Sequence, residues 1–201
     1  MTNHTRRASY EAFSIPYGRA CVKLGLTPNI LTALGLLTAG GAAAAFWQER
    51  FLFGVVLMLV TSFLDMLDGA TARAGNLGTV FGAVLDHNVD RVGEFLIILG
   101  IVLSGHVHPG WGMFALFGMW SASYARAAAE SIGKMKSCAV GIVGRFEKFV
   151  IILAGAVVEV FFPMKSLQFA MIVVGAISFV TTVQRLIYAH KALAGRAGGA
   201  S

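Results

Sequence analysis

The chain alternates long apolar stretches with short breaks of polar or turn-forming residues. Six stretches are each near the length of about 20 residues that a helix needs to cross a bilayer. They cover residues 29–48, 52–72, 80–104, 111–131, 146–162 and 166–189. Gly, Pro, Asn or charged residues separate them, as in Gly75-Asn76 and Pro163-Met164-Lys165. The pattern predicts an all-α integral membrane protein with six transmembrane helices.

The segment before the first apolar stretch has a different pattern. Arg19 and Lys23 interrupt a stripe of apolar side chains at steps of three or four residues: Tyr10, Phe13, Tyr17, Cys21 and Leu24. This spacing predicts an N-terminal amphipathic helix that lies along the membrane surface. Packing of the same stripe against the helical bundle fits the pattern equally well.

We therefore expect three regions in the chain. Residues 1–28 form the cytoplasmic N-terminus and the amphipathic juxtamembrane helix, and residues 29–193 form the six-helix transmembrane domain. The Gly- and Ala-rich tail, residues 194–201, is expected to be disordered.

Composition and charge support a membrane location. The sequence of 201 residues is 57% hydrophobic and 13% charged, with a mean hydropathy of +0.74, which excludes an ordinary soluble domain. Its net charge is +6, but the cations are dispersed at helix ends and form no basic stripe. We therefore expect membrane lipids and phosphorylated substrates as partners, and no nucleic acid.

The Lys and Arg residues also indicate an orientation. If the N-terminus is inside, every Lys and Arg except Arg50 and Lys165 lies on or near the cytoplasmic side. This bias predicts a multi-pass protein of the cell membrane with both termini in the cytoplasm. It also places the end of the second predicted span and the start of the third on the cytoplasmic side.

Four aspartates, Asp65, Asp68, Asp86 and Asp90, are the only ones in the chain, and they fall at this junction. An ionised Asp at the centre of a membrane helix costs about 2.5–3.5 kcal/mol, so unpaired acids there need a cation. Spacings of three and four residues put each pair on one helix face. Two such pairs on consecutive helices predict a site for hard divalent cations, which prefer oxygen ligands. Glu94 continues the second face by one turn, where a basic neighbour would account for it.

A longer motif surrounds these acids. Its eight positions are Asp65, Asp68, Gly69, Ala72, Arg73, Gly82, Asp86 and Asp90. This spacing resembles the signature of the CDP-alcohol phosphotransferase family. The resemblance implies a six-span helical fold over nearly the whole chain and a homodimer.

The resemblance also implies roles for the acids. Asp65, Asp68 and Asp86 would ligate two divalent cations, Mg²⁺ or Mn²⁺, and Asp90 would help to bind one of them. Asp90 would also be the catalytic general base that takes a proton from the acceptor hydroxyl. A structural network of these acids with Arg73 and Arg91 is the alternative.

Nucleotide binding is expected at residues around the same junction. By resemblance, the CDP-lipid contacts are Asn29, Thr32, Gly69, Ala72, Arg73 and Gly82. Thr79 joins them because it begins the third predicted span, where free backbone amides attract phosphate. Arg73 suits a diphosphate clamp. Thr79 also fits as a simple helix cap, and Gly82 fits helix packing equally well.

Cations elsewhere on the cytoplasmic side favour a phosphorylated acceptor. The candidates for binding its phosphate are Arg126, Lys134, Arg145 and Arg185. Their arrangement is similar to the phosphatidylinositol-phosphate synthase branch of the family, whose acceptor is inositol 1-phosphate. Glycerol 3-phosphate satisfies the same charge argument.

The sequence thus predicts a metal-dependent transferase of phospholipid biosynthesis. It would move a phosphatidyl group from a CDP-linked lipid, such as CDP-diacylglycerol, to a small phosphorylated polyol and release CMP. An archaeal-type diether donor remains an alternative. A membrane cation transporter is the alternative from another class, because intramembrane acids often mark ion pathways.

Overall fold

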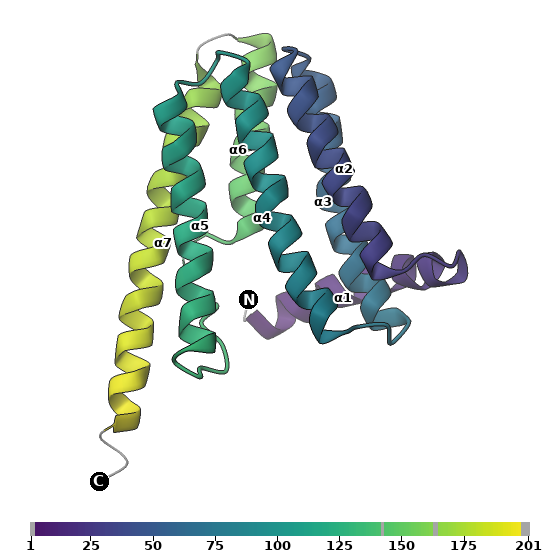
Figure 1. The fold of residues 1–201 in the computed structure, drawn as a ribbon, viewed down its shortest axis with the longest axis vertical. Helices are drawn as coiled ribbons and strands as arrows, with labels where there is room; N and C mark the ends of the chain where they lie inside the picture. Colours follow the sequence, from purple (N-terminus) through teal and green to yellow (C-terminus); the bar gives the residue numbers. More distant parts are fainter. Residues whose placement is uncertain (1–2, 142, 163–164, 198–201) are drawn as a thin grey trace. The chain divides into compact units, whose positions relative to one another are not determined.

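The computed structural model describes residues 3–141, 143–162 and 165–197, without the side chains of residues 3–12 and 195–197. Within these residues the chain is all-helical (Figure 1). The helices are α1 (Asn3–Lys23), α2 (Pro28–Trp47), α3 (Phe51–Ala74), α4 (Val80–Leu103), α5 (Pro109–Ser131), α6 (Arg145–Phe161) and α7 (Ser166–Ala197). Each of the six predicted apolar stretches coincides with one helix, from α2 to α7.

Local sequence explains where two of these helices begin. Thr27 caps α2, because its side chain accepts a hydrogen bond from the Ile30 N–H, and Pro28 follows at the first helical position. His108 precedes α5 and caps it in the same way, since its side chain accepts a hydrogen bond from the Gly110 N–H in the first turn. Cap and proline together set the helix start.

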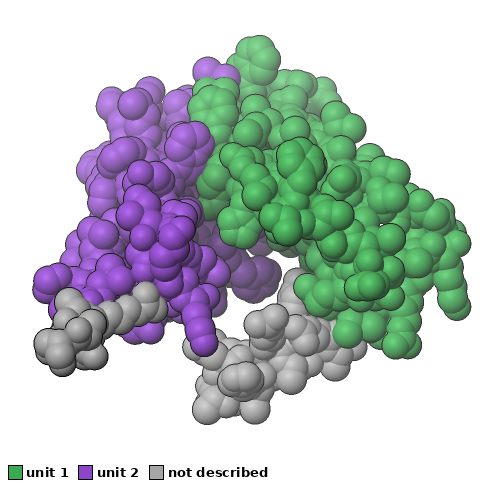
Figure 2. Space-filling model, turned by 60° about the horizontal axis from the view of Figure 1, so that its bottom comes forward, with its two compact units in different colours: residues 1–100 green, residues 101–201 purple. Residues whose placement is uncertain are grey.

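The chain forms two compact units, residues 1–100 and residues 101–201 (Figure 2). In the first unit α2 and α3 pack side by side, and α1 packs on α3. Phe46 of α2 is fully buried and lies so close to Gly54 of α3 that a side chain at Gly54 would collide with it. The hydroxyls of Thr38 and Thr61 lie 2.9 Å apart and link the same two helices.

Two glycines allow backbones to approach closely in the first unit. A Cβ at Gly18 of α1 would lie 2.9 Å from the Thr71 nitrogen of α3. A Cβ at Gly100 of α4 would overlap the Ala43 backbone of α2. Small residues at crossings are a common means of helix packing in membranes. Gly18 brings α1 against α3 just beyond Asp68.

The stripe predicted on the N-terminal helix is divided in the structure. Cys21 is buried against Leu31 and Leu67, whereas Phe13 and Tyr17 are exposed. Leu24, after the end of α1, is also exposed, and the Tyr10 side chain lies outside the described residues. Packing on the bundle therefore accounts for Cys21, and the membrane-surface location of α1 stays a prediction.

The second unit contains α5, α6 and α7. Phe114 of α5 stacks on Phe179 of α7 with ring centroids 5.1 Å apart. At the end of α6 the buried Glu159 accepts hydrogen bonds from the Ser166 hydroxyl, at 2.6 Å, and from the Leu167 N–H, at 3.1 Å. Its other oxygen lies 3.1 Å from Nδ1 of His106, so this carboxylate ties the loop before α5 to the start of α7.

Three of the described helices are long and apolar enough to cross a membrane, namely Pro28–Trp47, Phe51–Ala74 and Ser166–Ala194. Helix α6 has 17 residues, and α4 carries the charged residues described below. Large apolar side chains such as Leu37, Met113 and Phe169 are exposed, as expected for surfaces that face lipid. The expected disordered tail overlaps the last turn of α7, and residues 198–201 lie outside the described residues.

Candidate active site at the junction of α3 and α4

Three carboxylates converge in the first unit. Asp65 and Asp68 lie one turn apart on α3, and Asp86 lies on α4 after the short turn that joins the helices. One oxygen from each residue can be chosen so that all three lie within 4.8 Å of one another. We call these three residues the acid cluster. The convergence expected from helical spacing is therefore present for three of the four aspartates.

The donor set of the acid cluster suits a divalent cation. Asp68 is buried, and its two partners are half-buried. Like charges about 4 Å apart repel by about 4 kcal/mol at an effective dielectric of 20. A hard divalent cation removes this repulsion and prefers carboxylate oxygens. The residues present therefore fit a metal site.

Thr32 supports the acid cluster from α2. Its Oγ1 lies 2.9 Å from Oδ2 of Asp68 and 3.1 Å from the Pro28 carbonyl oxygen, and both Thr32 and Asp68 are buried. Hydrogen bonds of this kind orient the carboxylates that bind metals. Sequence reasoning assigned Thr32 to the nucleotide, whereas its observed contact is with the acid cluster. Its nucleotide role stays a prediction.

Asp90 lies one turn beyond Asp86 on the same face of α4. Among the described residues, the group that satisfies the 4.8 Å criterion does not include it. Its Oδ2 is 4.0 Å from Nη2 of Arg91, and its side chain is 14% exposed. The same Arg91 nitrogen is 2.7 Å from Oε1 of Glu94, so Glu94 does pair with a basic neighbour.

Three predicted nucleotide residues lie together beside the acid cluster. Thr79 caps α4, since its hydroxyl accepts from the Gly82 N–H at 2.9 Å. A Cβ at Gly82 would lie 2.9 Å from the Thr79 hydroxyl and 3.5 Å from Oδ1 of Asn29 at the start of α2. The neighbours of Gly82 are thus polar side chains. The free backbone amides at the start of α4 are also favourable for binding phosphate.

Arg73 lies over the surface of α3 next to Gly69. A Cβ at Gly69 would be 3.3 Å from Nη1 of Arg73, so the glycine leaves room for the guanidinium. Nη2 of Arg73 is 3.5 Å from the hydroxyl of Ser14, a fully buried residue of α1. Ala72 is half-buried on the same helix. Sequence reasoning missed Ser14, because a single serine in a segment interpreted as interfacial carries no signal.

The predicted acceptor cations of the second unit border an irregular connecting segment, residues 132–141. Nε of Arg185 donates to the Val140 carbonyl at 3.0 Å, and Nη1 donates to the Ala122 carbonyl. Nε of Arg126 donates to Glu130 at 2.9 Å, and the same Glu130 oxygen accepts from the Cys138 N–H at 2.9 Å. Arg126 and Arg185 thus hold the segment in place.

The other two acceptor candidates lie at the ends of this region. Lys134 is exposed and has a positive φ of 48°, which is uncommon outside glycine. Arg145 begins α6, with its guanidinium 5.5 Å from the ring centroid of Phe149. The phosphate-binding roles of all four cations stay predictions. Sequence reasoning missed Glu130, which contacts both Arg126 and the connecting segment.

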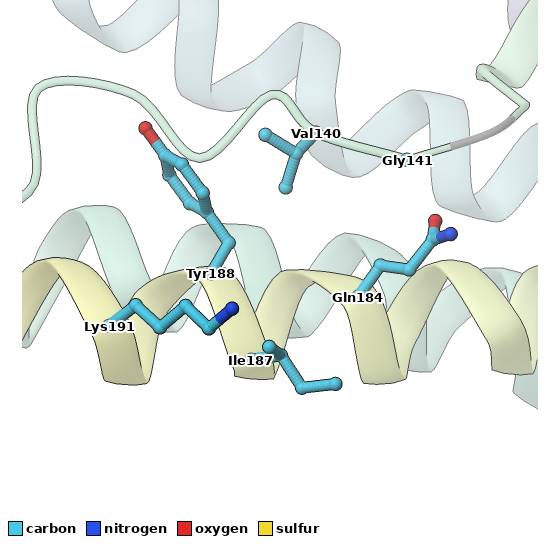
Figure 3. A pocket seen from close by; sticks show the side chains of 6 residues that line it. All are labelled: Val140, Gly141, Gln184, Ile187, Tyr188 and Lys191. Carbon is cyan, nitrogen blue, oxygen red and sulfur yellow. The ribbon is translucent and has the colours of Figure 1, made fainter.

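A shallow groove of about 490 Å³ lies between the connecting segment and α7 (Figure 3). Its lining residues are Val140, Gly141, Gln184, Ile187, Tyr188 and Lys191. The four on α7 follow a spacing of three and four residues and therefore share one helix face. The groove lining includes none of the four acceptor candidates.

Comparison with known proteins identifies similar sequences over nearly the full length. An archaetidylinositol phosphate synthase of Methanothermobacter thermautotrophicus is 36% identical over 171 residues, which cover 85% of this chain and 87% of that protein. A phosphatidylinositol phosphate synthase of Mycolicibacterium smegmatis is 36% identical over 190 residues, covering 90% and 85%.

Solved structures agree with the sequence comparison. The phosphatidylinositol phosphate synthase of Mycobacterium tuberculosis with CDP-DAG bound matches with a TM-score of 0.75 and 30% identity, covering 88% of this chain and 92% of that one. The same protein in complex with manganese and citrate matches with a TM-score of 0.76 and 30% identity, covering 88% of each chain.

The model of one protein family matches residues 25–194, which include the acid cluster, Asp90 and all the predicted nucleotide and acceptor residues. On this evidence, the chain is a member of the CDP-alcohol phosphatidyltransferase family.

Proposed function

We propose that this membrane enzyme transfers a lipid-linked phosphate from a CDP-lipid to inositol 1-phosphate and releases CMP. The acceptor hydroxyl oxygen forms a bond to the phosphorus that carries the lipid, and the bond from that phosphorus to CMP breaks. The single observation that carries the proposal is the acid cluster at the α3–α4 junction, set in the family motif. The names of the relatives support inositol phosphate as the acceptor.

A divalent cation belongs to this proposal. Asp65, Asp68 and Asp86 would hold it, with Asp90 beside them, and a related structure contains manganese. When bound, Mg²⁺ or Mn²⁺ supplies positive charge that offsets the charge of the diphosphate and of the leaving CMP. The family resemblance suggests two such ions.

The side chains of the first unit have separate tasks in the reaction. Asp90 accepts the proton of the acceptor hydroxyl, a role that suits a carboxylate beside the acid cluster. Arg73 holds the diphosphate through its guanidinium fork. The remaining nucleotide contacts come from Asn29, Thr32, Gly69, Ala72, Thr79 and Gly82. The proximity of Asn29, Thr79 and Gly82 supports this grouping.

The acceptor phosphate is assigned to the cations of the second unit. Lys134 and Arg145 are the direct candidates, since one lies in the connecting segment and the other begins α6. Arg126 and Arg185 complete the set and also hold the segment. Four cations suit a dianionic phosphate better than an uncharged alcohol.

We further propose that α2 to α7 all span the membrane and that α1 lies at its surface. The distribution of Lys and Arg supports a cytoplasmic location for both termini and the acid cluster, on the side where soluble inositol phosphate is available. The family resemblance supports a homodimer.

The test is CMP release by the purified full-length protein with Mn²⁺ or Mg²⁺. CDP-diacylglycerol and a CDP-activated diether lipid are each supplied with inositol 1-phosphate, glycerol 3-phosphate, inositol or serine. We expect CMP only with a metal ion and mainly with inositol 1-phosphate. Preference for glycerol 3-phosphate would change the acceptor, and no CMP with any pair would favour the cation transporter.

A further inference from the structure

Glu94 is a buried carboxylate that the mechanism above does not use. It lies on α4 one turn beyond Asp90, and its side chain is 1% exposed. A buried carboxylate destabilises a fold unless a cation or hydrogen bonds compensate it, and apolar residues of similar volume are often as stable. The presence of a charge at this position therefore calls for an explanation beyond packing.

Arg91 provides the compensating charge and connects Glu94 to the active site. Nη2 of Arg91 lies 2.7 Å from Oε1 of Glu94 and 4.0 Å from Oδ2 of Asp90. One guanidinium nitrogen thus lies between the buried carboxylate and the carboxylate assigned as the base. The Arg91 side chain is 25% exposed, so part of it contacts solvent.

The geometry of a helix explains why Glu94 matters for this arrangement. Neighbouring residues on a helix point in different directions, whereas residues three apart share a face. Arg91 therefore does not face Asp90 by register alone, but Glu94, three residues ahead, brings the guanidinium back to that face. Without the Glu94 carboxylate, the long Arg91 side chain loses a charged contact at 2.7 Å that directs it towards this face.

We propose that Glu94 is a positioning residue that acts through Arg91 on Asp90. Its carboxylate anchors the guanidinium, and the guanidinium holds the Asp90 carboxylate next to the acid cluster. This inference rests on the proposed function, because it assigns Glu94 to the orientation of the group that receives the acceptor proton. It predicts an effect on turnover with little effect on substrate binding, because the acid cluster and the nucleotide residues stay in place.

The experiment compares Glu94→Gln, Arg91→Met, Arg91→Lys and the double variant Arg91→Met/Glu94→Gln with the wild type. Each full-length protein is assayed for CMP release, for binding of CDP-diacylglycerol and of Mn²⁺, and for thermal stability in the same detergent. Glu159→Gln is the matched control, since it neutralises another buried carboxylate, one held by His106 and Ser166.

We expect Glu94→Gln and Arg91→Met each to lower kcat by about 10- to 100-fold, the size of effect seen for residues that orient metal-site ligands. Donor and Mn²⁺ affinities and both KM values should stay within about threefold of the wild type. Arg91→Lys should recover part of the loss, and the double variant should lose no more than either single variant. Glu159→Gln should keep its kcat.

Three outcomes would overturn the inference: a wild-type kcat in Glu94→Gln, strictly multiplicative losses in the double variant, or a loss of kcat in Glu159→Gln as large as in Glu94→Gln. If Glu94→Gln fails to fold, Arg91→Lys and Arg91→Met decide the question. Equal kcat values for both, at the wild-type level, would overturn it. A wild type that releases no CMP would instead contradict the proposed function.

Discussion

The acid cluster of the first unit lies on two regular helices, whereas the cations of the second unit surround an irregular segment. On α3 and α4, helical register puts Asp65 and Asp68 on one face and Asp86 on another, and one short turn joins the two helices. In residues 132–141 there is no repeating register, and the backbone is held by Glu130 and Arg185. Side-chain directions that follow from helical register can be predicted from the sequence. A backbone position that depends on side-chain contacts cannot.

The largest effects should come from the first unit. Asp90→Asn should lower kcat by about 10²- to 10⁴-fold, the range of a lost general base, while CDP-lipid and Mn²⁺ still bind. Asp68→Asn should instead abolish Mn²⁺ binding, because Asp68 belongs to the acid cluster. Calorimetric titration with Mn²⁺, together with CMP release, separates the two. Loss of donor binding in Asp90→Asn as severe as in Asp65→Asn would contradict the base role.

Substitutions in the second unit should have a smaller effect, confined to binding of the acceptor. Lys134→Ala or Arg145→Ala should raise the KM for inositol 1-phosphate by about 10- to 100-fold, because each removes a charge-assisted hydrogen bond worth about 1.5–3 kcal/mol. The Kd for the CDP-lipid should not change. Lys136→Ala is the control, since Lys136 is an exposed cation of the same segment. An unchanged acceptor KM in both variants would remove these cations from the site.

Thr32→Val tests how far the acid cluster depends on its support from α2. The variant loses the hydroxyl that lies 2.9 Å from Asp68, and we expect Mn²⁺ to bind about tenfold more weakly. Thr38→Val is the matched control on the same helix, because its hydroxyl contacts Thr61 and no member of the acid cluster. Should the two variants bind Mn²⁺ equally well, Thr32 has no supporting role.

The smallest effect should follow from weakening the contacts by which Glu130 holds the connecting segment in the second unit. Glu130→Gln removes the charge opposite Arg126 but keeps an oxygen for the Cys138 N–H. Partly exposed ion pairs contribute about 0–1 kcal/mol, so we expect about a threefold rise in the acceptor KM. Steady-state CMP release against inositol 1-phosphate concentration measures this. A larger rise in the acceptor KM than that of Lys134→Ala would mean that the Glu130 contacts, rather than the charge of Lys134, control acceptor binding.

Much of the fold could be predicted because the length and apolarity of membrane helices can be recognised in the sequence. All six apolar stretches coincide with helices, and the Thr27-Pro28 start of α2 follows capping chemistry. Composition alone does not set the number of spans, since α4 carries Asp86, Asp90, Arg91 and Glu94. Asp86, a member of the acid cluster, is one of the charges that reduce the hydropathy of α4.

Parts of the site depended on contacts between helices. Ser14 lies 3.5 Å from Arg73 only because Gly18 lets α1 pack against α3. The contact of Thr32 with Asp68 crosses from α2 to α3. No local sequence pattern indicates either contact, because the partners are 36 or more residues apart in the chain.

By itself the sequence determined the helical architecture, the position of the acid cluster and the family. Each of these depends on spacing within one helix or on one short turn, and such spacing is preserved in any fold that keeps the helices. Only the tertiary structure decided that Thr32 contacts Asp68, that Arg185 holds the connecting segment, and that α1 reaches Arg73. These depend on rotamers and on helix crossings, where long side chains choose among several partners, and the linear pattern does not specify that choice.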